Sequence, residues 1–379
     1  MPIWVTVITG FLGSGKTTLL NALLRHPGVA DVAVIVNEFG EIGVDSDLMT
    51  GSTETMVQLA NGCLCCSVKG DLIDTFRDLA IQRQAGVVPR FERVVIETTG
   101  IADPGPVLQV ILTHPMVRNA YALDGVVTTV DAVNGLTTLA TFPESVRQVA
   151  VADRLVLTKS DLPEAAATLP ALRAELRRIN PAAPIIDVVQ GAVDAAALLG
   201  TGVLDTATGR PAPDRWINPE AYAEAAQAAA AAAVPETALS GHALPAEAIA
   251  ATYARQHHAA HDEHGHAHGD VQSFCITRDE PIALDTLRLF LDAIAREAGP
   301  DLLRVKGLIH TVERPDMPAV VQGAQQVFHS LDWLDAWPTS DRRSRLVFIT
   351  RGIPRDHIED ALALIERVAR RTARAAGRV

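Results

Sequence analysis

The segment from Gly10 to Thr17 carries the residue types that bind the phosphates of a nucleotide. Its sequence, Gly-Phe-Leu-Gly-Ser-Gly-Lys-Thr, matches the pattern G-x-x-x-x-G-K-[ST]. Glycines at this spacing let backbone N–H groups converge on phosphate oxygens, and the N-terminus of a following helix favours negative charge. Lys16 is expected to reach the β- and γ-phosphates, and the Thr17 hydroxyl to ligate Mg²⁺. The nucleotide-binding residues predicted here are Gly10, Gly13, Ser14, Gly15, Lys16, Thr17 and Thr18.

Two later segments supply the other parts of such a site. Glu97 ends an apolar run, and its carboxylate is expected to hold Mg²⁺ or its water; the alternative is an ordinary surface carboxylate at a strand end. Gly100, three residues later, is a further predicted nucleotide-binding residue. Asp161 follows the apolar run at residues 155–157, and its carboxylate can accept hydrogen bonds from guanine N1–H and N2–H₂, which adenine does not offer. The stem of Lys159 can cover the base. Lys16, Thr17 and Glu97 are therefore the predicted catalytic group, with GTP as the nucleotide.

Three of the four cysteines lie within four residues, at Cys63, Cys65 and Cys66. Thiolates bind soft and borderline metals such as Zn²⁺, Co²⁺ or Cu⁺. The C-x-C-C spacing is too tight for three ideal tetrahedral positions, so an open site completed by a carboxylate or water is expected. Buried free cysteines and a redox switch remain alternatives.

Two other segments offer weaker metal ligands. Glu38, Glu41 and Asp45 follow the second apolar run, at the place where P-loop GTPases carry their first switch. They are candidates for binding metal or responding to the γ-phosphate, and a solvated acidic loop is the alternative. Six histidines occur in residues 257–268, and the H-x-H spacing of His264, His266 and His268 allows neighbours to share one ion. Loose metal binding is expected there, or else a solvated linker.

The elements that position these residues alternate between strand and helix. Residues 3–9 form a β-rich run, and residues 16–25 carry leucines on one helical face, so the phosphate loop lies between a strand and a helix. The other strand-like runs of this half are 32–36, 93–98, 125–130, 154–158 and 185–189. Runs this rich in Val and Ile are typical of strands buried on both faces, which predicts an α/β domain with a mostly parallel sheet.

The predicted domains are residues 1–205 for the α/β unit, 206–270 for an Ala-rich and His-rich linker, and 271–379 for a smaller α+β domain with antiparallel strands. The net charge of −12 argues against a nucleic-acid surface. No apolar run approaches the ~18 residues of a membrane span, and the N-terminus lacks a basic leader. A cytoplasmic protein without a membrane partner is expected.

Together these segments resemble the CobW-like family of metal-trafficking P-loop GTPases. The matching pieces are GFLGSGKTT at 10–18, NEFGEIGVD at 37–45, NGCLCCSVKGDL at 61–72, ETTGIADP at 97–104, LDGVVTTVDA at 123–132 and TKSD at 158–161. The resemblance implies GTP hydrolysis, Mg²⁺ dependence, Zn²⁺ or Co²⁺ binding at the cysteine motif, and a client protein that receives the metal. Thr158 departs from the Asn usual in N-K-x-D, which weakens one base contact.

The leading hypothesis is a GTP-hydrolysing metallochaperone that delivers Zn²⁺ or Co²⁺ to a client metalloprotein or metal-cofactor enzyme. One alternative is a metal-storage or sensing protein in which the nucleotide only gates binding. Another is an ATP-dependent kinase or ATPase unrelated to metals. Oligomerisation that depends on nucleotide or metal stays open.

Overall fold

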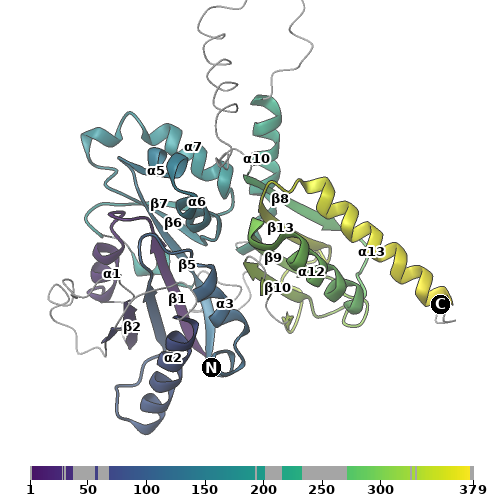
Figure 1. Cartoon of the computed structure of the whole chain (residues 1–379), viewed down its shortest axis with the longest axis horizontal. Helices are drawn as coiled ribbons and strands as arrows, with labels where there is room; N and C mark the ends of the chain where they lie inside the picture. The colour runs from purple at the N-terminus through teal and green to yellow at the C-terminus, as the bar shows by residue number, and fades with distance from the viewer. Residues whose placement is uncertain are drawn as a thin grey trace, which may run out of the picture.

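The computed structural model describes residues 2–27, 29, 31–36, 56–58, 68–192, 194–200, 216–232, 271–324, 327–328 and 331–375. These ranges contain two sheets, one in each half of the molecule (Figure 1). Among them, no helix is long and apolar enough to cross a membrane.

The N-terminal sheet has seven described strands in the order β3-β2-β4-β1-β5-β6-β7, and every neighbouring pair is parallel. Its strands are β1 (Ile3–Gly10), β2 (Val32–Val36), β3 (Met56–Gln58), β4 (Arg93–Glu97), β5 (Tyr121–Asp131), β6 (Arg154–Thr158) and β7 (Ile185–Val188). The predicted parallel α/β architecture is confirmed. Since all strands run the same way, the chain leaves the sheet at one common edge, which is where the predicted nucleotide residues lie.

Helices cover both faces of this sheet because alternate strand residues point to opposite sides. The helices are α1 (Lys16–Leu24), α2 (Val68–Ala85), α3 (Gly105–Thr113), α4 (Pro115–Ala120), α5 (Gly135–Thr141), α6 (Pro143–Ala150), α7 (Leu169–Ile179) and α8 (Ala195–Leu198). In β6, Leu155 and Leu157 pack with α6 and α7, whereas Val156 between them packs with α1 and α8. The leucines of α1 reach this second face, as their helical spacing predicts.

The C-terminal half is an antiparallel sheet in the order β11-β10-β9-β13-β8, with β12 paired to β10. Its elements are β8 (Val271–Arg278), α12 (Leu284–Ala298), β9 (Leu302–Ile309), β10 (Ala319–Ala324), β11 (Val327–Phe328), β12 (Asp332–Trp333), β13 (Ser344–Arg351) and α13 (Arg355–Ala375). The predicted α+β domain is therefore confirmed. Helices α12 and α13 pack on one face of its sheet, and α13 extends past the body of the domain in Figure 1.

The second face of the C-terminal sheet is buried against the rest of the chain. Val271, Leu303 and Ile349 share one apolar cluster with residues of α6 and α7. Trp216 packs against the same sheet with Ile217 and Tyr222, the last of which lies on α10 (Pro219–Ala232). Figure 1 shows α10 standing beside β8. The domain boundaries stay predictions, but α10, inside the range predicted as a linker, contributes to the core beneath this sheet.

A buried charge cluster also joins the two halves. Asp153, just before β6, forms ion pairs with Lys306 and, at 3.4 Å, with Arg304, both on β9, and all three side chains are almost fully buried. Burial raises the pKa of Asp153, but the two cations outweigh it and hold the pKa below its ordinary value. Burial lowers the pKa of Lys306 to about 8, against the opposing charge of Asp153. The domain interface therefore contains specific polar contacts as well as apolar packing.

Candidate nucleotide site

The phosphate loop is held by hydroxyl groups from two neighbouring strands. Ser14 Oγ and Thr129 Oγ1, at the end of β5, share a hydrogen bond of 2.6 Å. Thr158, the last residue of β6, donates from Oγ1 to Ser14 O at 2.8 Å. Thr158, the residue that departs from the N-K-x-D pattern, thus anchors the phosphate loop through this hydrogen bond to the backbone of Ser14.

Two glycines allow the backbone segments of the site to approach closely. Gly10 has φ 142°, and a Cβ added there would overlap Thr129. A Cβ on Gly100 would lie 2.7 Å from the backbone N of Leu12. Larger residues at either position would push the phosphate loop away from its neighbours. Gly100, predicted as a site residue, therefore touches the phosphate loop through its backbone.

The predicted catalytic group comes together at this edge of the sheet. Lys16 Nζ donates to Gly10 O at 3.0 Å and to Phe11 O at 3.1 Å, so its ammonium lies inside the loop. Thr17 Oγ1 donates to Glu97 Oε1 at 2.7 Å, although eighty residues separate them. The hydrogen bond joins the first turn of α1 to the end of β4. A cation held by both side chains would therefore lie beside Lys16 and the loop.

The oxygen atoms of Thr17 and Glu97 fit a hard cation. Mg²⁺ prefers oxygen ligands and is usually held by one or two protein groups together with phosphate oxygens and water. A hydroxyl and a carboxylate in direct contact at a phosphate loop match that donor set. When bound there, Mg²⁺ would neutralise charge on the β- and γ-phosphates.

The predicted base-binding residues line one cavity of about 220 Å³. Its lining includes Gly15, Thr18, Lys159 and Asp161. Asp161 is exposed, so its carboxylate is open to a ligand. The structure thus brings the N-terminal turn of α1 and the residues after β6 to the same place, as the hypothesis of a guanine site requires.

Asp131, at the end of β5, was not identified from the sequence. Lys159 Nζ donates to Asp131 Oδ2 at 2.8 Å, and Lys159 itself has φ 58°. Burial raises the pKa of Asp131, but hydrogen bonds from Lys159, Asn134 and the Val133 N–H outweigh it and hold the pKa below its ordinary value. The carboxylate therefore stays ionised and fixes the lysine beside the cavity. The only sequence signal was its place at the end of an apolar run.

The predicted metal ligands other than Thr17 and Glu97 lie outside the described residues. These are Glu38, Glu41, Asp45, Cys63, Cys65, Cys66, His264, His266 and His268. Within the described part of the chain, no three His, Cys, Asp or Glu side chains gather into a possible metal site. Metal binding at the cysteine motif, the acidic segment and the histidine tract therefore stays a prediction.

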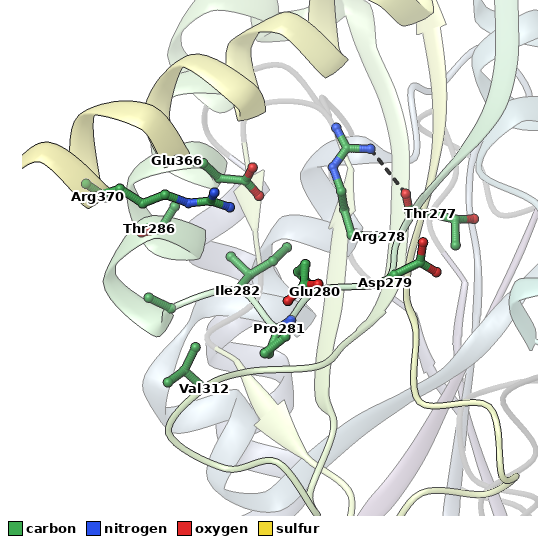
Figure 2. A pocket seen from close by; sticks show the side chains of 12 residues that line it. Thr277, Arg278, Asp279, Glu280, Pro281, Ile282, Thr286, Val312, Glu366 and Arg370 are labelled. Atoms are coloured by element: carbon green, nitrogen blue, oxygen red, sulfur yellow. Dashed lines mark hydrogen bonds between the residues drawn. The ribbon is translucent and has the colours of Figure 1, made fainter. Parts of the chain in front are cut away.

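A larger cavity, of about 650 Å³, lies in the C-terminal domain between the β8–α12 connection and α13 (Figure 2). Figure 2 shows Glu366 and Arg370 of α13 across from Arg278, whose guanidinium donates to Thr277 O. Its charged lining mixes both signs. Its lining includes neither a glycine-rich loop nor a cluster of thiolates or histidines.

Comparisons with known proteins cover both halves. A family model described as "CobW/HypB/UreG, nucleotide-binding domain" matches residues 4–187, and "Cobalamin synthesis protein cobW C-terminal domain" matches residues 271–365. The chain is 33% identical over 362 residues to Zinc chaperone YjiA of Escherichia coli (strain K12), covering 96% of this chain and 98% of that protein.

A second relative matches about half of the chain. The chain is 40% identical over 200 residues to Zinc-regulated GTPase metalloprotein activator 1 of Schizosaccharomyces pombe, covering 51% of this chain and 47% of that protein. This alignment spans about half of the yeast relative. Among solved structures, Zn(II)-bound YjiA GTPase from E. coli is similar over 96% of this chain and 99% of that one, with a TM-score of 0.62 and 28% identity.

Proposed function

The chain belongs to the CobW family of P-loop GTPases, and from that premise we propose that it uses GTP to load zinc and deliver it to a client protein. It is a GTPase. The observation that carries the metal half of the proposal is the alignment with a zinc chaperone along both domains, rather than along the nucleotide domain alone. The client is a metalloprotein or metal-cofactor enzyme, and Co²⁺ is the alternative cargo.

Hydrolysis is attack of water on the γ-phosphate, helped by positioning and by neutralisation of charge. Lys16 and the loop amides stabilise the transferring phosphoryl group, while Thr17 and Glu97 would hold the magnesium ion. The direct contact between Thr17 and Glu97 supports this assignment. Asp161 reads the guanine base, and Asp131 orients Lys159 over it.

The zinc cargo is bound by Cys63, Cys65 and Cys66, which follow Gln58 at the end of β3 by five to eight residues. In the sheet register, Gln58 pairs with Val36, and Val36 pairs with Glu97. Two strand spacings make the step from Gln58 to Glu97 about 10 Å. Gln58, the last described residue before the cysteines, is thus tied through the sheet to the end of β4, and on this basis we propose that a change at the γ-phosphate alters the thiolate site.

The test is a competition titration of Zn²⁺ and of Co²⁺ with a non-hydrolysable GTP analogue and with GDP. We expect metal affinities that differ between the two nucleotide states by about 1–3 kcal/mol, the usual size of such coupling. Cys63→Ser, Cys65→Ser and Cys66→Ser should each weaken the tightest site. Cys275→Ser is the matched control, since Cys275 lies half-buried on β8, and it should leave the affinity unchanged.

Equal metal affinities in both nucleotide states would contradict the coupling. Unchanged affinity in all three serine variants would move the cargo site elsewhere. Negligible GTP turnover with metal and client both present would favour a storage or sensing role.

The histidine tract is proposed as a secondary store of weakly bound metal. Deleting residues 257–268 should lower the number of weakly bound ions and spare the tightest one, because a low-complexity polar segment loses entropy when it is ordered around an ion. Equilibrium dialysis of the deletion variant against Zn²⁺ measures both quantities. Loss of the tightest site would make the tract a primary ligand set.

A further inference from the structure

Helix α6 holds the backbone segment that follows Glu97, the predicted catalytic glutamate. Gln148 on this helix is 1% exposed, and its Nε2 donates to Gly100 O at 3.1 Å and to Ala102 O at 3.0 Å. Arg147, the preceding residue, forms an ion pair of 3.7 Å with Asp103. One turn of α6 therefore fixes the segment that begins three residues after Glu97 and touches the phosphate loop.

The same helix also contacts the C-terminal domain. Val146, Val149 and Ala150 share an apolar cluster with residues of the C-terminal strands β8, β9 and β13. Three residues after α6 ends, Asp153 forms its buried ion pairs with β9. A short helix thus contacts the nucleotide site through one part of its surface and the C-terminal sheet through another.

Space lies beside Gln148 on the phosphate-loop side. A cavity of about 190 Å³ is lined by Phe11, Leu12 and Ser14 of the loop and by Ser145 and Gln148 of α6. Gln148 Oε1 is buried and has no hydrogen-bond partner in the described part of the chain. A close-packed interior resists movement, whereas unfilled volume beside a half-bonded amide lets the helix and the loop change their separation.

Asn180 shows what a purely structural amide looks like in the same region. Its Nδ2 donates to three carbonyls at and after the end of α6, those of Val149, Ala150 and Ala152, and its Oδ1 accepts from the Ala183 N–H. All of its bonds stay within the scaffold. Gln148, by contrast, bonds to the segment after Glu97 and leaves its oxygen unpaired.

We propose that Gln148 is a positioning residue for GTP hydrolysis and that α6 couples the nucleotide site to the C-terminal domain. Gln148 sets the backbone of residues 100–102 relative to the phosphate loop, and a shift of that backbone moves α6 against the C-terminal strands. The inference rests on the GTPase activity and is independent of which metal is carried.

The first test compares Gln148→Met with Asn180→Leu, two substitutions of similar shape that remove buried amides. Steady-state GTP hydrolysis is measured below the melting temperature of both variants. Gln148→Met is expected to lower kcat at least tenfold with KM within about twofold, because Gln148 lies away from the base cavity. Asn180→Leu should keep kcat despite a comparable loss of melting temperature.

Wild-type kcat in Gln148→Met would overturn the positioning role, and so would an equal loss of kcat in Asn180→Leu. Failure of the wild-type protein to hydrolyse GTP would contradict the GTPase activity itself, and this result is distinct from a failure of the inference about Gln148.

The second test measures hydrogen exchange of peptides covering β9 and β13 with GDP and with a non-hydrolysable GTP analogue. Wild type and Asn180→Leu should show a difference between the two nucleotides, and Gln148→Met should lose it. The coupling is overturned if the wild type shows no difference, or if Gln148→Met keeps the wild-type difference.

Discussion

At the carboxyl edge of the parallel sheet, Glu97 and Asp131 end β4 and β5, whereas Arg93 and Asp124 lie near the amino edge of the same two strands. The amino-edge charges satisfy each other. Arg93 pairs with Asp124, whose Oδ2 also accepts from Thr6 Oγ1 and the Gly200 N–H, each at 3.0 Å. At the carboxyl edge, the carboxylate of Glu97 accepts a hydrogen bond from Thr17 Oγ1, the hydroxyl that would share its magnesium ion.

The difference shows how one sheet separates stability from function. Buried charges that are paired with protein groups hold the amino edge and the domain interface together, and removing one partner leaves a buried charge uncompensated. Charges at the carboxyl edge lie beside the candidate nucleotide site, in keeping with the general position of ligand sites in open α/β sheets. Substitutions at the two edges should therefore separate loss of fold from loss of activity.

The largest expected effect is at the domain interface. Asp153→Ala removes the only carboxylate that pairs with Lys306 and Arg304 among the described residues, and it should lower the free energy of unfolding by about 3–5 kcal/mol. Chemical denaturation measures this loss. Asp187→Ala, which breaks the half-exposed pair with Arg173, is the control and should cost about 0–1 kcal/mol. Equal losses would remove the distinction between interface and surface.

For Lys16→Ala we expect the opposite result, a large loss of activity with little loss of stability. The ammonium acts on phosphate charge, so its loss should reduce kcat for GTP by about 10²–10³-fold, similar to removal of a transition-state donor. Thermal unfolding should change little, because the ammonium of Lys16 donates to two carbonyls of the phosphate loop, Gly10 O and Phe11 O, rather than forming an ion pair in the core. Hydrolysis at the wild-type rate with Mg²⁺ would show that this loop does not bind the reacting phosphate.

Base selectivity gives a smaller effect. GTP should bind at least tenfold more tightly than ATP, a difference of about 1.4 kcal/mol. Asp161→Asn should reverse the preference toward xanthine nucleotides, because an amide presents a donor where the carboxylate accepts. Glu164→Gln, an exposed residue outside the cavity lining, is the control. Equal ATP and GTP affinities in the wild type would contradict the guanine assignment.

The smallest effect concerns pH at the domain interface. The pKa of Lys306 is lowered to about 8 in the folded protein. Between pH 8 and the ordinary pKa of lysine, Lys306 is therefore mostly protonated in the unfolded chain and mostly neutral in the folded protein. The stability of the wild type relative to Lys306→Met should therefore rise with pH above about 8, by at most about 1.4 kcal/mol per pH unit. Denaturation at pH 7.5 and 9 tests the sign, and a fall would contradict it.

The sequence by itself determined the phosphate loop, the parallel α/β class, the antiparallel C-terminal domain and the family. These are local signals: the loop motif spans eight residues, and strand burial shows as runs of Val and Ile such as Val32–Val36. Glu97 and Asp161 were predicted as site residues for a similar reason, since Glu97 ends an apolar run and Asp161 comes shortly after one. The strand limits of β2 and β6 also agree with those expected.

Only the tertiary structure decided which distant residues meet. Asp131 pairs with Lys159 across twenty-eight residues, Gln148 reaches Gly100 across forty-eight, and Asp153 meets Lys306 across more than one hundred and fifty. A lone Asp, Gln or Lys has no pattern that distinguishes it from a solvated surface residue. Its partner is set by the order of the strands and by the packing of the second sheet, and these depend on contacts that no local window of sequence contains.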